Sequence, residues 1–183
     1  MPNIFNILES GPNSNNWTNI EVIVEKHTVS STLRAWLTET SLLTSKLRKN
    51  VADYRFEVLQ EYFDEGKNNS SNKMFVREVA MLSNNRPYIF GQTKAPEKTL
   101  REHPWINTLG EKTLGEALKN VGKVVRSDFS YNCFNISNIE LENIGIKEIK
   151  QPLIWARRST FNLGDENLST VELFLPGIEC LSN

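Results

Sequence analysis

Two pairs of apolar stretches, each joined by a short polar turn, constrain the fold of this chain more than any other feature. In the first pair, "FVREVAML" (75–82) and "YIFGQTKAP" (88–96) flank the turn sequence "SNNRP". In the second pair, "LIWARRSTFNL" (153–163) and "STVELFLP" (169–176) flank "GDEN". Asn, Asp and Gly favour tight turns, and turns this short connect neighbouring antiparallel strands. The sequence therefore predicts two β-hairpins.

Two further stretches, "YRFEVL" (54–59) and "VVRSDFSYNCFNI" (124–136), raise the predicted number of strands to six. Hairpin connections indicate an antiparallel sheet, and helices before and within the run of strands indicate an α+β fold. We expect a six-stranded antiparallel sheet flanked by short helices. The length of 183 residues fits one domain over residues 1–183, with a loose N-terminal segment at 1–20.

Four helices are predicted, two before the first strand and two within the run of strands. Apolar residues at helical spacing between 31 and 50 indicate two of them, the first with Ser31 as its cap. Two shorter helices are expected later, one ending at Gly110 and one beginning at Thr113.

Charge and cysteine usage exclude several kinds of partner. There are 21 Lys and Arg against 22 Asp and Glu, so a basic surface for nucleic acid is not expected. Cys133, Cys180, His27 and His103 lack the spacing of a zinc site. No stretch has the pattern of a signal peptide or the length of a membrane span. We therefore expect a cytoplasmic monomer without metal, nucleic acid or membrane insertion.

Charged residues within apolar strands are the unusual feature of the sequence. Arg77 lies in the middle of "FVREVAML", and Glu172 lies in "STVELFLP". A buried ion loses several kcal/mol of hydration unless an opposite charge meets it. One interpretation is a structural pair between Arg77 and Glu172, or separate pairs that involve Glu78, Arg157 or Arg158.

The alternative interpretation places Arg77 and Glu172 in the wall of a ligand cavity. The planar guanidinium of arginine can hold a carboxylate through two hydrogen bonds, so Arg77 would suit an anionic substrate. A desolvated carboxylate such as Glu172 would suit general acid or base chemistry. This interpretation predicts an anionic substrate and proton transfer.

A second anion site is possible at "TLGEALKN". Thr113 and Glu116 match the capping box, which places the backbone amide of Leu114 in the first turn of a helix, where unpaired N–H groups attract a carboxylate. The same pattern also fits an ordinary capped helix with Leu114 in the core. The two interpretations stay open on spacing alone.

Six segments of the chain, in order, resemble the chorismate pyruvate-lyase family, which forms 4-hydroxybenzoate for ubiquinone biosynthesis. They are "LLTSKLR", "VREV", "NRPYIFGQT", "LGEKTLGEAL", "WARRSTF" and "VELFLP". The resemblance implies a six-stranded antiparallel sheet that encloses a ligand cavity. It also implies conversion of chorismate to 4-hydroxybenzoate and pyruvate, a carbon–oxygen lyase reaction that needs no cofactor.

The same resemblance implies roles for four residues. Arg77 would bind the ligand carboxylate, Glu172 would lie close to the ligand, and both would act in catalysis. Leu114 would contact the ligand through its backbone, and Leu43 would contribute an apolar wall.

One position departs from the family. Gln92 stands where these enzymes commonly have an arginine that adds charge near the substrate, and Lys94 is a candidate to replace that charge. This departure keeps open a catalytically impaired relative that binds another aromatic acid. A second alternative, a non-catalytic sensor, is implied because the same fold resembles the ligand-binding domain of some bacterial transcription regulators.

Overall fold

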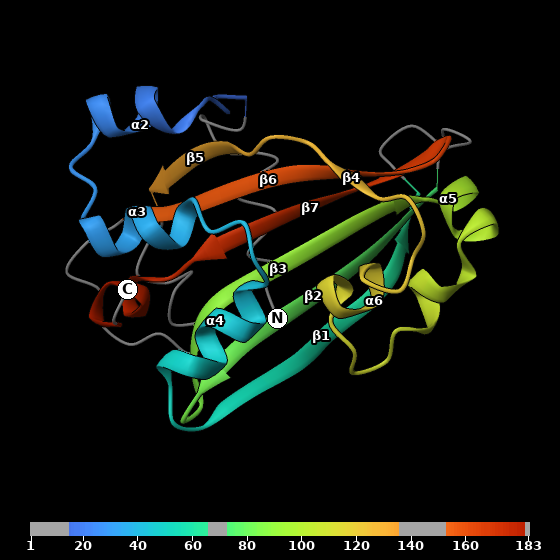
Figure 1. Cartoon of the computed structure of the whole chain (residues 1–183), viewed down its shortest axis with the longest axis horizontal. Helices are drawn as coiled ribbons and strands as arrows, with labels where there is room; N and C mark the ends of the chain where they lie inside the picture. The colour runs from blue at the N-terminus through green and yellow to red at the C-terminus, as the bar shows by residue number, and fades with distance from the viewer. Residues whose placement is uncertain (1–14, 66–72, 136–152, 182–183) are drawn as a thin grey trace.

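The computed structural model describes residues 15–65, 73–135 and 153–181. In this part of the chain, seven strands form one antiparallel sheet in the order β1-β2-β3-β7-β6-β4, and β5 also pairs with β6 (Figure 1). The strands are β1 (Tyr54–Asp64), β2 (Met74–Ser83), β3 (Arg86–Pro96), β4 (Val125–Arg126), β5 (Ser130–Asn135), β6 (Leu153–Leu163) and β7 (Glu166–Phe174). The predicted α+β class and antiparallel sheet are confirmed, with seven described strands instead of six.

The additional strand arises because the strand predicted at 124–136 is interrupted. The short β4 pairs with one end of β6, and β5 pairs with the other end. Between them, the hydroxyl of Ser127 accepts a hydrogen bond from the amide of Thr160 at 2.9 Å, where a backbone carbonyl would continue the ladder. The side chain replaces the backbone acceptor, so the regular pairing stops and resumes at Ser130.

Both predicted hairpins are confirmed. Asn84 and Asn85 connect β2 to β3 with φ angles of 49° and 60°, the left-handed conformation that a type I′ turn requires at both central residues. The second hairpin has Gly164 at φ 80° between β6 and β7. Strand β7 begins at Glu166, earlier than predicted, because the pairing with β6 continues to the turn.

Short helices precede the first strand, follow the last strand and connect β3 to β4. They are α2 (Ile20–Lys26), α3 (Ser31–Leu37), α4 (Leu43–Asn50), α5 (Glu97–Glu102) and α6 (Leu114–Leu118), with 3-10 helices η1 (Pro104–Thr108) and η2 (Pro176–Cys180). The cap of α3 is Ser30, whose hydroxyl accepts from the amide of Leu33, and not Ser31 as predicted. Within the segment expected to be loose up to residue 20, Thr18 pairs with Tyr131.

One face of the sheet carries two apolar cores at opposite ends. At one end α2, α3 and α4 pack on the strands through a cluster that includes Trp36, Leu47, Met81, Trp155 and Phe174. At the other end α5, η1 and α6 pack through a cluster that includes Phe75, Leu100, Ile106, Leu118 and Leu168. Figure 1 shows α4 and α6 over the middle of the sheet. The two cores leave the middle of this face open to a cavity.

The opposite face of the sheet has a core of its own, formed by Ala80, Phe90, Phe134, Ile154, Ala156, Leu173 and Leu175. Because successive side chains point to opposite faces, residues next to these along a strand belong to the cavity face. No helix in the described part of the chain has the length and hydropathy needed to cross a membrane.

Candidate active site

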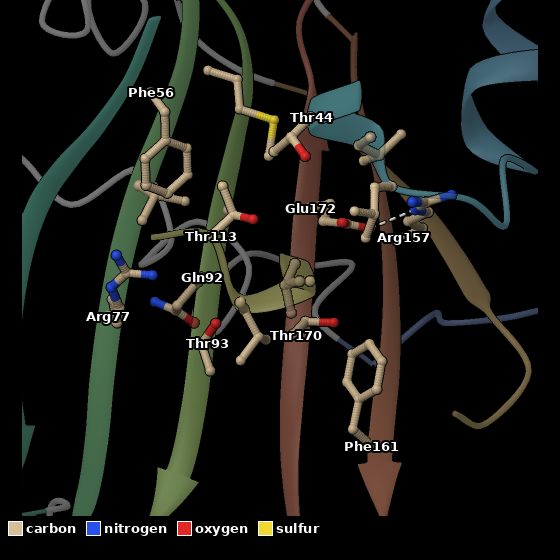
Figure 2. Close-up of a pocket in the computed structure, with 18 of the residues that line it drawn as sticks. Thr44, Phe56, Arg77, Gln92, Thr93, Thr113, Arg157, Phe161, Thr170 and Glu172 are labelled. Atoms are coloured by element: carbon tan, nitrogen blue, oxygen red, sulfur yellow. Dashed lines mark hydrogen bonds and ion pairs between the residues drawn. The ribbon is translucent and has the colours of Figure 1, made fainter. Parts of the chain in front are cut away.

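A cavity of about 100 Å³ lies between the two cores. Strands β2, β3, β6 and β7 provide its floor, and the starts of α4 and α6 provide its sides. All four residues singled out from the sequence line it: Leu43, Arg77, Leu114 and Glu172. Figure 2 shows Arg77 at one side of this space and Glu172 with Arg157 at the other. The volume is on the scale of one six-membered ring, since a cavity of about 150 Å³ can hold benzene.

Arg77, on β2, is only 2% exposed and has a protein carboxylate beside it. Its Nε donates to Glu61 Oε1 at 2.8 Å, and its Nη2 donates to the carbonyls of Gly110 at 2.6 Å and Lys112 at 3.1 Å. Burial lowers the pKa of Arg77, and Glu61 partly opposes this change. Among the described residues Nη1 has no acceptor, so one edge of the guanidinium is left for a ligand.

Glu172, on β7, is paired with Arg157 of β6 and not with Arg77. Its Oε2 accepts from Arg157 Nε at 2.5 Å and lies 3.8 Å from Arg126 Nη2. No described residue contacts Oε1 through a hydrogen bond. The structure therefore has separate pairs: Glu172 with Arg157, which the sequence left open, and Arg77 with Glu61, which the sequence analysis did not name.

Arg157 donates its hydrogen bonds to groups of the protein itself. Its side chain is 1% exposed, and its Nη1 donates to the carbonyls of Leu37 at 2.9 Å and Glu39 at 2.5 Å, at the end of α3. These bonds satisfy carbonyl groups that a helix end leaves unpaired. Arg157 thus holds both Glu172 and the segment that leads into α4.

The predicted capping box at the start of α6 is confirmed. Thr113 Oγ1 accepts from the amide of Glu116, and the amide of Thr113 donates to Glu116 Oε2. The amide of Leu114 has no partner among the described residues. Leu43, at the start of α4, is buried and belongs both to the cavity wall and to the first core.

Gly115 lets α6 approach α4 closely, which leads to a first prediction. A Cβ at this position would lie 2.4 Å from Cδ2 of Leu42. We expect Gly115→Ala to destabilise the protein by about 1 kcal/mol, the low end of the loss on overpacking, because the contacted atom is the end of a leucine side chain that can rotate. Thermal unfolding would measure it, with Gly122→Ala as the matched control because a Cβ there meets nothing within 4 Å. Equal thermal midpoints for the two variants would contradict the tight contact.

The position that departs from the resembling enzymes faces away from Arg77. Gln92 borders the cavity, but its side-chain amide donates to Glu78 Oε1 at 2.8 Å. Gln92 stands opposite Glu78 in the sheet, whereas Arg77 stands opposite Thr93, so the two side chains project from opposite faces. Lys94 shares the face of Gln92 and does not line the cavity. Neither side chain therefore projects from the sheet face that carries Arg77, and the influence of these two residues on the charge near a ligand stays a prediction.

Sequence reasoning missed Arg126 as a site residue and considered Arg157 only as an ion-pair partner. Both line the cavity, together with Phe161. Arg126 lies in "VVRSDF", an arginine that follows two valines, and the argument that singled out Arg77 could have found it. The proximity of Arg126 to Glu172 depends on strand order, which no local pattern shows.

Comparison with known proteins identifies the family of this chain. The family model for chorismate lyase matches residues 13–179. The chain belongs to the chorismate lyase family. It is 31% identical over 164 residues to a probable chorismate pyruvate-lyase of Psychromonas ingrahamii, covering 81% of this chain and 85% of the relative. It is 27% identical over 150 residues to the chorismate pyruvate-lyase of Pectobacterium atrosepticum, covering 77% and 75%. The family and the lyase class predicted from the sequence are confirmed.

Solved structures resemble this member of the chorismate lyase family in fold alone. A possible transcriptional regulator of Bacillus subtilis, YydK, aligns with a TM-score of 0.51 at 10% identity, covering 88% of this chain and 85% of that chain. At such low identity the likeness concerns the arrangement of strands and helices, not the residues of the cavity.

Proposed function

We propose that this protein is a chorismate pyruvate-lyase that converts chorismate to 4-hydroxybenzoate and pyruvate. The observation that carries the proposal is the placement of Arg77 and Glu172 in the wall of one ring-sized cavity, in a chain of the chorismate lyase family. Each has one polar atom without a partner among the described residues, Nη1 of Arg77 and Oε1 of Glu172.

The proposed reaction is an elimination that balances without a co-reactant. The bond between the ring and the ether oxygen breaks, a proton leaves the ring carbon that carries the hydroxyl group, and the ring becomes aromatic. The enolpyruvate released takes up a proton and becomes pyruvate. A site for this reaction must hold the ring, fix its carboxylate and provide an acceptor near the hydroxyl end.

The described contacts support one orientation of the ring. The ring carboxylate would accept from Arg77 Nη1 and from the amide of Leu114, the two unpaired donors considered above. The hydroxyl end would then point toward Glu172 Oε1, across the cavity (Figure 2). Leu43 would pack on the ring as an apolar wall.

The direct test is incubation of the purified protein with chorismate, followed by separate measurement of 4-hydroxybenzoate and pyruvate. Release of both in equal amounts, faster than the uncatalysed reaction, is the expected result. Tight binding of 4-hydroxybenzoate without turnover would instead favour a sensor of the same fold. Use of the product for ubiquinone, in the cytoplasm, is part of the proposal; a strain without the gene should regain ubiquinone when supplied with 4-hydroxybenzoate.

A second prediction concerns the position at which the chain departs from its relatives. We expect Gln92→Arg to leave the affinities for chorismate and 4-hydroxybenzoate nearly unchanged, because the new cation would pair with Glu78 on the face away from Arg77. Isothermal titration with 4-hydroxybenzoate would measure the effect. A sharp loss of affinity in a folded variant would mean that the side chain at 92 reaches the ligand.

A further inference from the structure

Arg126, on β4, has fewer hydrogen bonds to the described protein than the other two arginines of the cavity. Its Nε donates to Ser159 Oγ at 3.0 Å, and its Nη2 is 3.8 Å from Glu172 Oε2. No described residue accepts from Nη1. Its side chain is 25% exposed, compared with 2% for Arg77 and 1% for Arg157. Arg126 is therefore the cation with the most unused hydrogen-bonding capacity.

Aromatic rings hold Arg126 in place. Its guanidinium lies 4.0 Å from the ring centre of Phe129 and 5.1 Å from that of Phe161. Rings contact the face of a guanidinium and leave its hydrogen-bonding edge free. Burial lowers the pKa of Arg126, Glu172 opposes the change, and the neighbouring charge of Arg157 adds to it. A cation in such surroundings gains strongly from an anion at its free edge.

The charges around the cavity leave Arg126 without a carboxylate of its own. Glu61 neutralises Arg77, and Glu172 neutralises Arg157, both at hydrogen-bond distance. The carboxylate near Arg126 is the same Glu172, at the longer distance of 3.8 Å. Among the described cavity residues and their ion-pair partners, cations thus exceed anions by one.

Arg126 lies next to Glu172 in the cavity, and on the ring of chorismate the enolpyruvyl ether lies next to the hydroxyl group. Chorismate carries a hydroxyl group para to its ring carboxylate, and the enolpyruvyl ether is on the adjacent carbon. With the hydroxyl end at Glu172, the enolpyruvyl group lies beside Glu172, where Arg126 is. We infer that Arg126 binds the carboxylate of the enolpyruvyl group, a contact that the dianionic substrate makes and the monoanionic product does not. This inference rests on the proposed function.

The inference separates the roles of two arginines. Arg77 would contact the ring carboxylate, which chorismate and 4-hydroxybenzoate share. Arg126 would contact a carboxylate that leaves with pyruvate. Loss of Arg126 should therefore affect dianions alone, whereas loss of Arg77 should affect both kinds of ligand.

The test is isothermal titration of two ligands into the parent protein and its Arg126→Met variant. The ligands are 3-(1-carboxyvinyloxy)benzoate, a stable dianion that cannot undergo the elimination, and 4-hydroxybenzoate. We expect Arg126→Met to weaken binding of the dianion by about 10- to 100-fold, the range for loss of a charged hydrogen-bond partner, and to leave 4-hydroxybenzoate nearly unchanged. Arg158→Met is the matched control, because Arg158 is exposed and does not line the cavity.

Equal effects on the two ligands, or no effect on the dianion, would overturn the inference. Arg126→Gln provides the same comparison if the Met variant does not fold, and Arg126→Lys should restore part of the affinity for the dianion. The role of Arg126 and the proposed reaction can be tested independently of each other. A parent protein that releases no pyruvate from chorismate contradicts the lyase proposal, while the comparison of ligands still decides the role of Arg126.

Discussion

Glu172→Gln should lower the turnover of chorismate by about 10²- to 10⁴-fold, the range for removal of a group that takes part in proton transfer. The amide keeps the shape of the side chain and one acceptor oxygen for Arg157 Nε, so the position of Arg157 should change little. The variant loses the negative charge and the capacity to exchange a proton at Oε1. Single-turnover conversion of chorismate, beside the affinity for 4-hydroxybenzoate, would measure the two consequences separately.

Because Glu172 is paired with Arg157, the stability of the Glu172→Gln variant must be measured as well. Loss of one partner from a buried ion pair can destabilise a protein by about 3 to 5 kcal/mol, and less here because Glu172 is 19% exposed. Glu78→Gln is the matched control: Glu78 is a buried carboxylate of the same sheet, on the opposite face, bonded to Gln60 and Gln92. A destabilised Glu172→Gln protein with nearly full activity would make Glu172 a structural residue only.

Arg77→Met should weaken binding of 4-hydroxybenzoate by about 30- to 4,000-fold, which corresponds to the 2 to 5 kcal/mol lost when a buried charge partner is truncated. The variant should also lose stability, by about 0.5 to 1.5 kcal/mol for each hydrogen bond that the side chain no longer donates. Two of these bonds reach the carbonyls of Gly110 and Lys112, which Arg77 holds before the start of α6. Titration with 4-hydroxybenzoate and thermal unfolding would give the two values.

Glu61→Gln shows whether the carboxylate of the protein or that of the ligand is the principal partner of Arg77. It removes the negative charge 2.8 Å from Arg77 Nε and leaves the cation in place. If Arg77 binds the ring carboxylate, this variant should bind 4-hydroxybenzoate as tightly as the parent or more tightly. For the Arg77→Met variant the contrary result is equally clear. If that protein stayed folded and bound 4-hydroxybenzoate as tightly as the parent, Arg77 would not be the residue that binds the ligand carboxylate.

Local signals explain which parts of the fold could be predicted. The turns at 83–87 and 164–167 use residues that adopt left-handed backbone, so both hairpins were predictable. Helix α2 was not, because "IEVIVEK" is rich in β-branched residues with low helix propensity. It forms where Asn19 caps it and its buried isoleucines pack on the first core.

The site residues were predictable for a related reason. Arg77 and Glu172 stand out because each is an ion in an apolar strand, and the capping box at Thr113 marks the start of α6. The sequence named Arg157 among the candidate partners, but it did not name Glu61 and could not decide which pairs form. Glu61 lies 16 residues before Arg77, and Arg157 lies 15 residues before Glu172, separations that become contacts only through strand pairing.

The sequence by itself determined the hairpins, the α+β class and the residues whose charges need a partner, because each depends on short-range chemistry. Only the tertiary structure decided which residue stands beside Arg77. Ser83 pairs with Arg86 at the turn, and continuing that register would place Gln92 opposite Arg77. A bulge between Met81 and Leu82, opposite the extra residue Tyr88, shifts the pairing by one residue and places Thr93 there instead. Because the side-chain period of a strand is two, that single residue turns Gln92 away from the cavity.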